Sequence, residues 1–174
     1  MAWSPGSLAD ANVGYLLRTA NRLIHHLDGV QVDVAFEIDG ESVALRDMVP
    51  GDIAYVCQTW ERNYRPSAGV SDVVYAREQH RLINRILAAP STTVVIACSP
   101  DVTSTIHGWA CGDADRLHYA YVPLALRGKG LARAMISRLL GAYPQRIEVT
   151  SRFHNGNEAR TRFVHNPYPL MVNA

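Results

Sequence analysis

Apolar residues recur every three to four positions in five segments of the chain, which is the spacing of one face of an α-helix. The first segment follows Ser7 and Asp10, a pair typical of a capping box, and Gly29 suits a C-terminal stop after it. Ser71 is a capping residue before the third segment. The pattern predicts helices over residues 8–27, 52–64, 71–87, 131–140 and 155–163.

Other segments alternate apolar and polar residues, or run apolar and β-branched, as strands do. Asp39-Gly40 is a strong two-residue hairpin turn between the first two of them. Thr92 to Cys98 is almost continuously apolar, so we expect both faces of this strand to be covered. The predicted strands cover residues 30–38, 42–46, 92–98, 104–111, 117–122 and 147–151, and residues 166–172 close the chain as an extended piece.

The length of 174 residues, with 48% hydrophobic and 19% charged content, indicates one globular domain with at most a small appendage. No apolar run approaches the ~18–20 residues of a membrane span, and the first residues lack the features of a secretory signal. Cys57, Cys98 and Cys111 are scattered and have no metal-binding spacing. We therefore expect a cytoplasmic protein with free core thiols, no membrane segment and no metal.

The charged residues are unevenly distributed along the chain. Residues 1–115 hold 8 basic and 14 acidic groups, whereas residues 116–174 hold 9 basic and 2 acidic groups. A positive C-terminal third suits a polyanionic ligand, which a phosphorylated cofactor or a nucleic acid would both satisfy.

The basic third contains the stretch around which the chain is organised, Leu117–Leu140. It begins as a strand, which Pro123 ends because proline has no N–H for the ladder. An amphipathic helix follows, and the free N–H groups at a helix start favour anions. The loop before that helix combines two residues without Cβ and two cations: Arg127, Gly128, Lys129 and Gly130.

The run Arg127-x-x-Gly130-x-Ala132 after this strand resembles the acyl-CoA pyrophosphate loop of GNAT-type N-acetyltransferases. It lacks the Gly-Lys-Ser/Thr ending of a Walker loop and the third glycine of a dinucleotide fingerprint. The element order, a helix pair, an antiparallel meander, a strand and then the loop and helix, is also the GNAT order. The resemblance covers about residues 43–172, and the run Phe163…Asn166-Pro167-Tyr168 is similar to bacteriophage-encoded GNAT-like proteins.

The resemblance implies an α/β (α+β) GNAT fold, with a mixed, mostly antiparallel central sheet flanked by helices. Residues 1–42 would be an N-terminal helix and hairpin extension, and residues 43–174 the acyltransferase domain. Acetyl-CoA would be the co-substrate, and the backbone N–H of Val122 would donate to the oxyanion. The implied cofactor-binding residues are Ala120, Tyr121, Val122, Arg127, Gly128, Lys129, Gly130, Leu131 and Ala132.

His118 lies four residues before Val122, where arylalkylamine acetyltransferases of the family place a histidine for proton removal. The family's usual general acid is a tyrosine on a later helix, and Phe163 falls at that place here. Tyr168 is our preferred substitute, ahead of His165 or Ser151. Candidates to contact the acceptor are Trp60, Tyr64, Tyr75, His80 and Tyr119.

The resemblance implies transfer of an acetyl group from acetyl-CoA to a primary amine of a small molecule or protein, by direct attack in a ternary complex. Two alternatives stay open: a GNAT-like modifier of nucleic acids or nucleobases, and a non-catalytic interaction protein that keeps the CoA fold. The resemblance is also compatible with a homodimer, because GNAT domains often dimerise.

Overall fold

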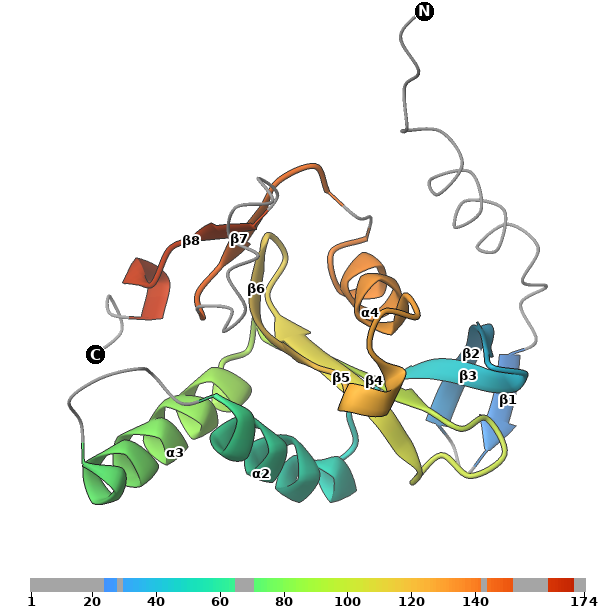
Figure 1. The fold of residues 1–174 in the computed structure, drawn as a ribbon, viewed down its shortest axis with the longest axis horizontal. Helices are drawn as coiled ribbons and strands as arrows, with labels where there is room; N and C mark the ends of the chain where they lie inside the picture. Colours follow the sequence, from blue (N-terminus) through green and yellow to red (C-terminus); the bar gives the residue numbers. More distant parts are fainter. Residues whose placement is uncertain (1–23, 28–29, 65–70, 142–143, 152–162, 171–174) are drawn as a thin grey trace, which may run out of the picture.

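The computed structural model describes residues 24–27, 30–64, 71–141, 144–151 and 163–170. Eight strands form one sheet whose spatial order is the chain order (Figure 1). Neighbouring strands are antiparallel from β1 to β6, and the pairs β6–β7 and β7–β8 are parallel. The strands are β1 (Ile24–Leu27), β2 (Val30–Ile38), β3 (Glu41–Asp47), β4 (Thr93–Cys98), β5 (Ile106–Gly112), β6 (Arg116–Tyr121), β7 (Ile147–Val149) and β8 (Phe163–His165).

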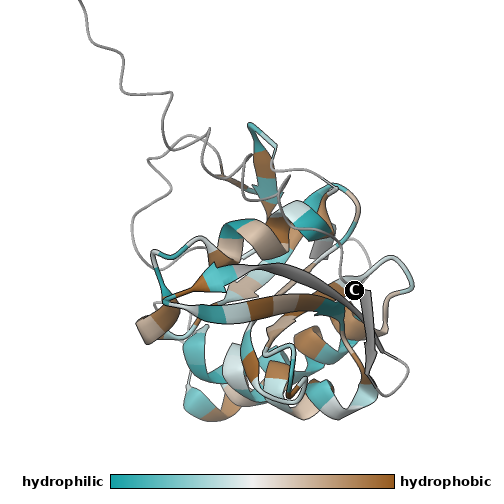
Figure 2. Ribbon diagram, turned by 90° about the vertical axis from the view of Figure 1, so that its right-hand side faces the viewer, coloured by the Kyte–Doolittle hydropathy of each residue, from teal (hydrophilic) through white to brown (hydrophobic). Residues whose placement is uncertain are grey.

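Helices cover both faces of this sheet (Figure 1). One face carries α4 (Leu131–Leu139), and the other carries α2 (Ile53–Asn63) and α3 (Asp72–Ala88). Short 3-10 turns η1 (Pro50–Asp52), η2 (Leu124–Leu126) and η4 (Tyr168–Leu170) complete the described elements. Hydrophilic and hydrophobic residues alternate along the flanking helices, as expected when one helix face lies on a sheet (Figure 2).

The core is therefore divided in two by the sheet. On the α4 side, Leu131 and Met135 pack against strand residues that include Val95 of β4. On the α2–α3 side, Trp60 packs against Val94 and other residues of the same central strands. Successive residues of β4 point to opposite clusters, so the prediction that both faces of this strand are covered is confirmed. The mixed, mostly antiparallel sheet with flanking helices is confirmed as well.

The predicted helix over residues 8–27 is wrong at its C-terminal end. Residues 8–23 lie outside the described part of the chain, but Ile24–Leu27 is strand β1, antiparallel to β2. A short apolar run such as this one fits the spacing of a helix as well as that of a strand. Pairing with the alternating Val30–Ile38 segment decides for the strand. β2 in turn pairs with β3, and the proposed domain boundary after residue 42 falls inside β3.

The predicted helix over residues 155–163 is wrong at Phe163, while residues 155–162 lie outside the described part. Phe163–His165 is strand β8, whose pairing with β7 aligns Phe163 with Ile147. Aromatic and β-branched residues suit a strand when a partner is available. Phe163 therefore does not lie on a helix, and the placement of the family's acid tyrosine at this residue is also wrong. The predicted extended end contains the 3-10 turn η4.

A buried ion pair joins the sheet to α2. The Arg46 guanidinium of β3 donates to both carboxylate oxygens of Asp52, at 2.6 and 2.9 Å, and to the carbonyl oxygen of Thr103. The Asp52 carboxylate also accepts the backbone N–H of Val49. Arg46 is only 2% exposed, so the pair fixes the start of α2 against β3 and the β4–β5 connection.

Candidate functional site

The loop between β6 and α4 has the geometry of an anion cradle, which we define as residues 127–132. Gly128 and Gly130 adopt φ angles of +80° and +88°, a region that favours glycine. The first helical hydrogen bond runs from the Ala134 N–H to the carbonyl of Gly130, so the N–H groups before Ala134 have no acceptor within the helix. A Cβ at either glycine would meet no atom within 4 Å, which leaves room for a ligand against the backbone.

Two cations flank this backbone. The Arg127 side chain donates through Nε to the carbonyl oxygen of Val122 at 2.9 Å, which pins the loop to the end of β6. Lys129 pairs through Nζ with the carboxylate of Asp39, the turn residue of the β2–β3 hairpin. Lys129 of the cradle therefore already binds one anionic group of the chain, the carboxylate of Asp39.

Beside the cradle, β6 has an unpaired edge. Its parallel pairing with β7 consists of Arg116 with Glu148 and Leu117 with Val149, followed by one bond from the Thr150 N–H to the Leu117 carbonyl. β6 then runs on past β7 towards the start of α4 (Figure 1). In the part of the chain that the structure describes, residues 119–122 pair with no strand on this side. An extended ligand could therefore add to this edge through backbone hydrogen bonds.

A β-bulge at His118 changes the direction of side chains along β6. Cys111 of β5 is aligned with Tyr119, but the next residue, Gly112, is aligned with Leu117, so His118 is the extra residue. Leu117 belongs to the core on the α4 side, whereas Tyr119 belongs to the core on the α2–α3 side. His118 lines a pocket against α3, so it and Tyr119 serve the same face of the sheet.

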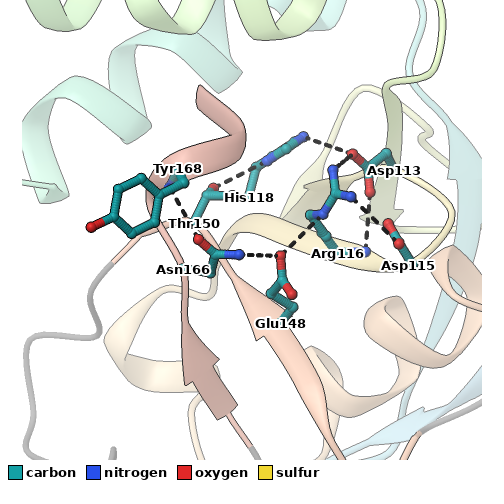
Figure 3. A network of polar contacts seen from close by, with 8 residues as sticks. All are labelled: Asp113, Asp115, Arg116, His118, Glu148, Thr150, Asn166 and Tyr168. Carbon is teal, nitrogen blue, oxygen red and sulfur yellow. Dashed lines mark hydrogen bonds and ion pairs between the residues drawn. The ribbon is translucent and has the colours of Figure 1, made fainter. Parts of the chain in front are cut away.

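His118 belongs to a polar network that continues through Asp113 to Arg116 (Figure 3). Its Nδ1 lies 3.1 Å from the Thr150 hydroxyl, and its Nε2 lies 3.8 Å from the Asp113 carboxylate. Asp113 in turn accepts the backbone N–H and a guanidinium N–H of Arg116. Glu148 on β7 bonds both Arg116 and Asn166, which ties the network to the strands on either side.

Burial decides the charge of this histidine. His118 is 6% exposed, and this burial lowers its pKa below the usual value because the charged imidazolium is poorly solvated. Asp113 acts in the opposite direction, and Arg116 adds to the lowering. His118 is therefore neutral at neutral pH, which is the form that accepts a proton.

The predicted acceptor contacts Trp60, Tyr64 and Tyr119 do come together. The Trp60 and Tyr119 rings stack with centroids 5.3 Å apart, and Tyr64 meets Tyr119 edge-on at 5.8 Å. Trp60 is only 1% exposed, so in this state it packs in the core. Burial raises the pKa of Tyr119 to about 12, so its hydroxyl stays protonated and serves as a donor rather than a base.

The remaining candidates lie apart from this cluster. Tyr75 donates to the Glu61 carbonyl and His80 bonds the Glu61 carboxylate, so both connect α2 with α3. Tyr168 in η4 is 70% exposed, and its hydroxyl points away from His118 in Figure 3. Ser151 is buried just beyond β7.

Asp113, Arg116 and Thr150 were missed at the level of sequence. Gly112-Asp113-Ala114-Asp115 has the composition of an ordinary turn, and only the two aspartates directly before Arg116 could have drawn attention to it. Within the described ranges no helix is long and apolar enough to cross a membrane, and no group of His, Cys, Asp and Glu is arranged to hold a metal ion.

Comparisons with known proteins give a likeness in fold. No protein-family profile and no curated protein sequence matches the chain. One similar solved structure is a Desulfovibrio desulfuricans protein assigned to the GNAT acetyltransferase family, with 24% identity, a TM-score of 0.37, and coverage of 55% of this chain. The match spans 62% of that protein, which is less than two thirds of its length.

Two further solved structures are similar. AAC(6')-Iy, in complex with the bisubstrate analogue CoA-S-monomethyl-acetylneamine, has 15% identity and a TM-score of 0.43, covering 68% of this chain and 84% of that one. Ribosomal-protein-alanine N-acetyltransferase from Brucella melitensis biovar Abortus has 13% identity and a TM-score of 0.41, covering 68% and 86%. These likenesses concern the fold alone.

Proposed function

We propose that this protein is an acetyl-CoA-dependent N-acetyltransferase acting on a primary amine. The observation that carries the proposal is the order of features along β6: a buried neutral histidine, an unpaired strand edge and a glycine cradle at a helix start. An elongated cofactor with phosphates at one end and its reactive group at the other fits this order. The proposal includes a catalytic domain at residues 43–174 with residues 1–42 as its extension.

The cradle fits the pyrophosphate of such a cofactor. Gly128 and Gly130 leave the backbone open, and Arg127 and Lys129 supply positive charge. From Val122 to His118 the strand spans about 13 Å, four residues at about 3.3 Å each. Acetyl-CoA supplies an activated acyl thioester when bound. The backbone of residues 120–122 would align its extended arm, so that the thioester lies towards His118.

Direct transfer to the amine is favoured over a cysteine-bound intermediate. All three cysteines are free thiols, and burial raises the pKa of Cys57, Cys98 and Cys111, so each stays protonated and poorly nucleophilic. His118 is then the group that removes a proton from the acceptor. Free thiols also suit a cytoplasmic setting.

The proposal is tested by following thiol release from acetyl-CoA with the full chain and a panel of primary amines. We expect release that depends on the amine and yields the acetylated amine by mass spectrometry. Binding of acetyl-CoA with no release for any amine, small or peptide, would contradict catalysis and support the non-catalytic alternative.

Asp39 gives a prediction for the cradle. The Asp39 carboxylate forms an ion pair with the Lys129 ammonium group, so it competes with any phosphate that binds this group. We expect Asp39→Asn to tighten acetyl-CoA binding by about twofold to fivefold, the worth of an exposed ion pair. Calorimetric titration at low salt measures this, with Glu41→Gln on the same hairpin as the control. Unchanged or weaker binding in Asp39→Asn would contradict the competition.

A further inference from the structure

A pocket of about 160 Å³ lies on the α3 side of the sheet, next to His118. Its walls come from the C-terminal part of α3, the turn between β5 and β6, β6 itself and η4; they include Arg85, Ile86, Asp113, Arg116, His118 and Pro169. The cradle precedes α4, which packs on the opposite face of the sheet. The pocket is therefore separate from the cradle, and His118 lines the pocket from β6.

The pocket wall contains one carboxylate that a cation can contact. Three carboxylates surround the guanidinium of Arg116: Asp113 at 3.3 Å, Asp115 at 3.5 Å and Glu148 at 3.1 Å. Arg85 contributes one further positive charge to the wall. Of these three carboxylates only Asp113 lines the pocket, where its side chain is 15% exposed beside the guanidinium groups of Arg85 and Arg116.

We infer that this pocket is the acceptor site and that it takes a small primary amine as its ammonium ion, held by the Asp113 carboxylate. The inference rests on the proposed acetyl transfer and names the acceptor class for it. It also moves the acceptor from the aromatic cluster of Trp60 and Tyr64, which is packed core, to the polar pocket beside it.

The geometry of Asp113 and His118 suits an ammonium group between them. Their separation of 3.8 Å, from Oδ2 to Nε2, is too long for a direct hydrogen bond. When Nδ1 donates its proton to the Thr150 hydroxyl at 3.1 Å, Nε2 carries the lone pair. An ammonium group beside both atoms can donate one N–H to the carboxylate and one to Nε2.

Proton removal then takes a single step. One N–H bond of the ammonium group breaks, the proton passes to Nε2 of His118, and the electron pair stays on the amine nitrogen, which becomes nucleophilic. The resulting imidazolium faces Asp113, whose negative charge stabilises it. The other charged groups lining the pocket are Arg85 and Arg116, and Arg116 disfavours the imidazolium and so promotes loss of its proton afterwards.

The volume limits the size of the group that enters the pocket and suits a small acceptor. A protein cavity of about 150 Å³ accommodates benzene, so a pocket of about 160 Å³ holds one ring or a chain of similar size. Benzylamine, a single ring that carries an ammonium group at neutral pH, is therefore a suitable probe, and benzyl alcohol is its uncharged counterpart.

Binding is measured by NMR on the full chain at pH 7.5, following the His118 ring proton and the ligand together. We expect benzylamine to bind and to show contacts to the His118 ring, and benzyl alcohol to bind at least tenfold more weakly. Asp113→Asn should lose about tenfold in benzylamine affinity, and the His118 pKa should fall further because the opposing carboxylate charge is gone. The matched control is Asp115→Asn, since Asp115 contacts Arg116 but lies outside the pocket.

Equal binding of benzyl alcohol, or unchanged benzylamine affinity in a folded Asp113→Asn variant, would overturn the inference. The wild-type contacts to the His118 ring test the site even if a variant fails to fold: benzylamine bound elsewhere overturns it too. Failure of the proposed function looks different, because acetyl-CoA would then not bind while benzylamine still contacts His118. Acetyl-CoA binding with no amine at His118 overturns the pocket alone.

Discussion

His118→Ala is expected to lower kcat for amine acetylation by about 100-fold to 10,000-fold, the contribution typical of a positioned general base. His118 is buried, neutral at neutral pH and placed at the edge of β6 where the acceptor pocket begins. Steady-state thiol release at saturating acetyl-CoA measures the loss. The affinity for acetyl-CoA should change little, because the cradle lies at the other end of β6.

The pH profile provides the control for a role in proton transfer. Burial lowers the pKa of His118, so the acid limb of kcat/KM in the wild type should lie below the ordinary histidine value of 6.5, with activity rising as pH rises through it. Thr150→Val removes the hydroxyl at Nδ1 and should reduce the rate more mildly without removing the limb. A limb that persists in His118→Ala would assign it to another group and contradict the base.

Arg46→Ala is expected to destabilise the fold by about 3–5 kcal/mol, because it leaves the buried Asp52 carboxylate without its charged partner. Burial alone would raise the pKa of Asp52, but the hydrogen bonds from Arg46 and Val49 outweigh it and lower the pKa. Their contribution to stability is present above the ordinary value of 3.8 and is lost as pH falls through the lowered folded value. Urea unfolding at pH 7 measures the loss.

A double variant tests whether the loss comes from the unpaired Asp52 charge. Arg46→Met with Asp52→Leu removes both charges at similar volume and should recover most of the loss, because apolar replacements of a buried pair are often neutral. Arg77→Ala breaks an exposed pair with Glu78 and should have a far smaller effect. Equal losses of unfolding free energy in Arg46→Ala and Arg77→Ala would contradict the stabilising role of the buried Arg46–Asp52 ion pair.

Sequence signals were sufficient to predict structure where residues only a few positions apart determine it. Ser71 caps α3 as predicted, through a bond from the Val74 N–H to its side chain. Asp39 and Gly40 both have positive φ, as the predicted hairpin turn requires. Gly130 likewise starts α4 with positive φ. In each case the signal is a residue type whose preferred backbone angles or side-chain bonds act within a few positions.

The rest depends on contacts between distant segments. Ile24–Leu27 and Phe163–His165 become strands because β2 and β7 are available as partners, which no local pattern reports. The bulge at His118 is a property of register between β5 and β6, and it brings His118 to the face where Asp113 and α3 meet. Strict alternation along β6 would have placed Leu117 and Tyr119 on the same face of the sheet, whereas the bulge puts them on opposite faces.

The cradle is the feature that most directly decides whether this chain uses acetyl-CoA. Calorimetric titration of the full chain with acetyl-CoA should give micromolar binding, and an Arg127→Ala, Lys129→Ala double variant should lose at least about tenfold, ~1.4 kcal/mol. An Arg77→Ala, Arg81→Ala variant removes the same charge from the exposed side of α3 and should bind as the wild type does. No binding by the wild type, or an equal loss in both double variants, would contradict the assignment of residues 127–132 as the cofactor cradle.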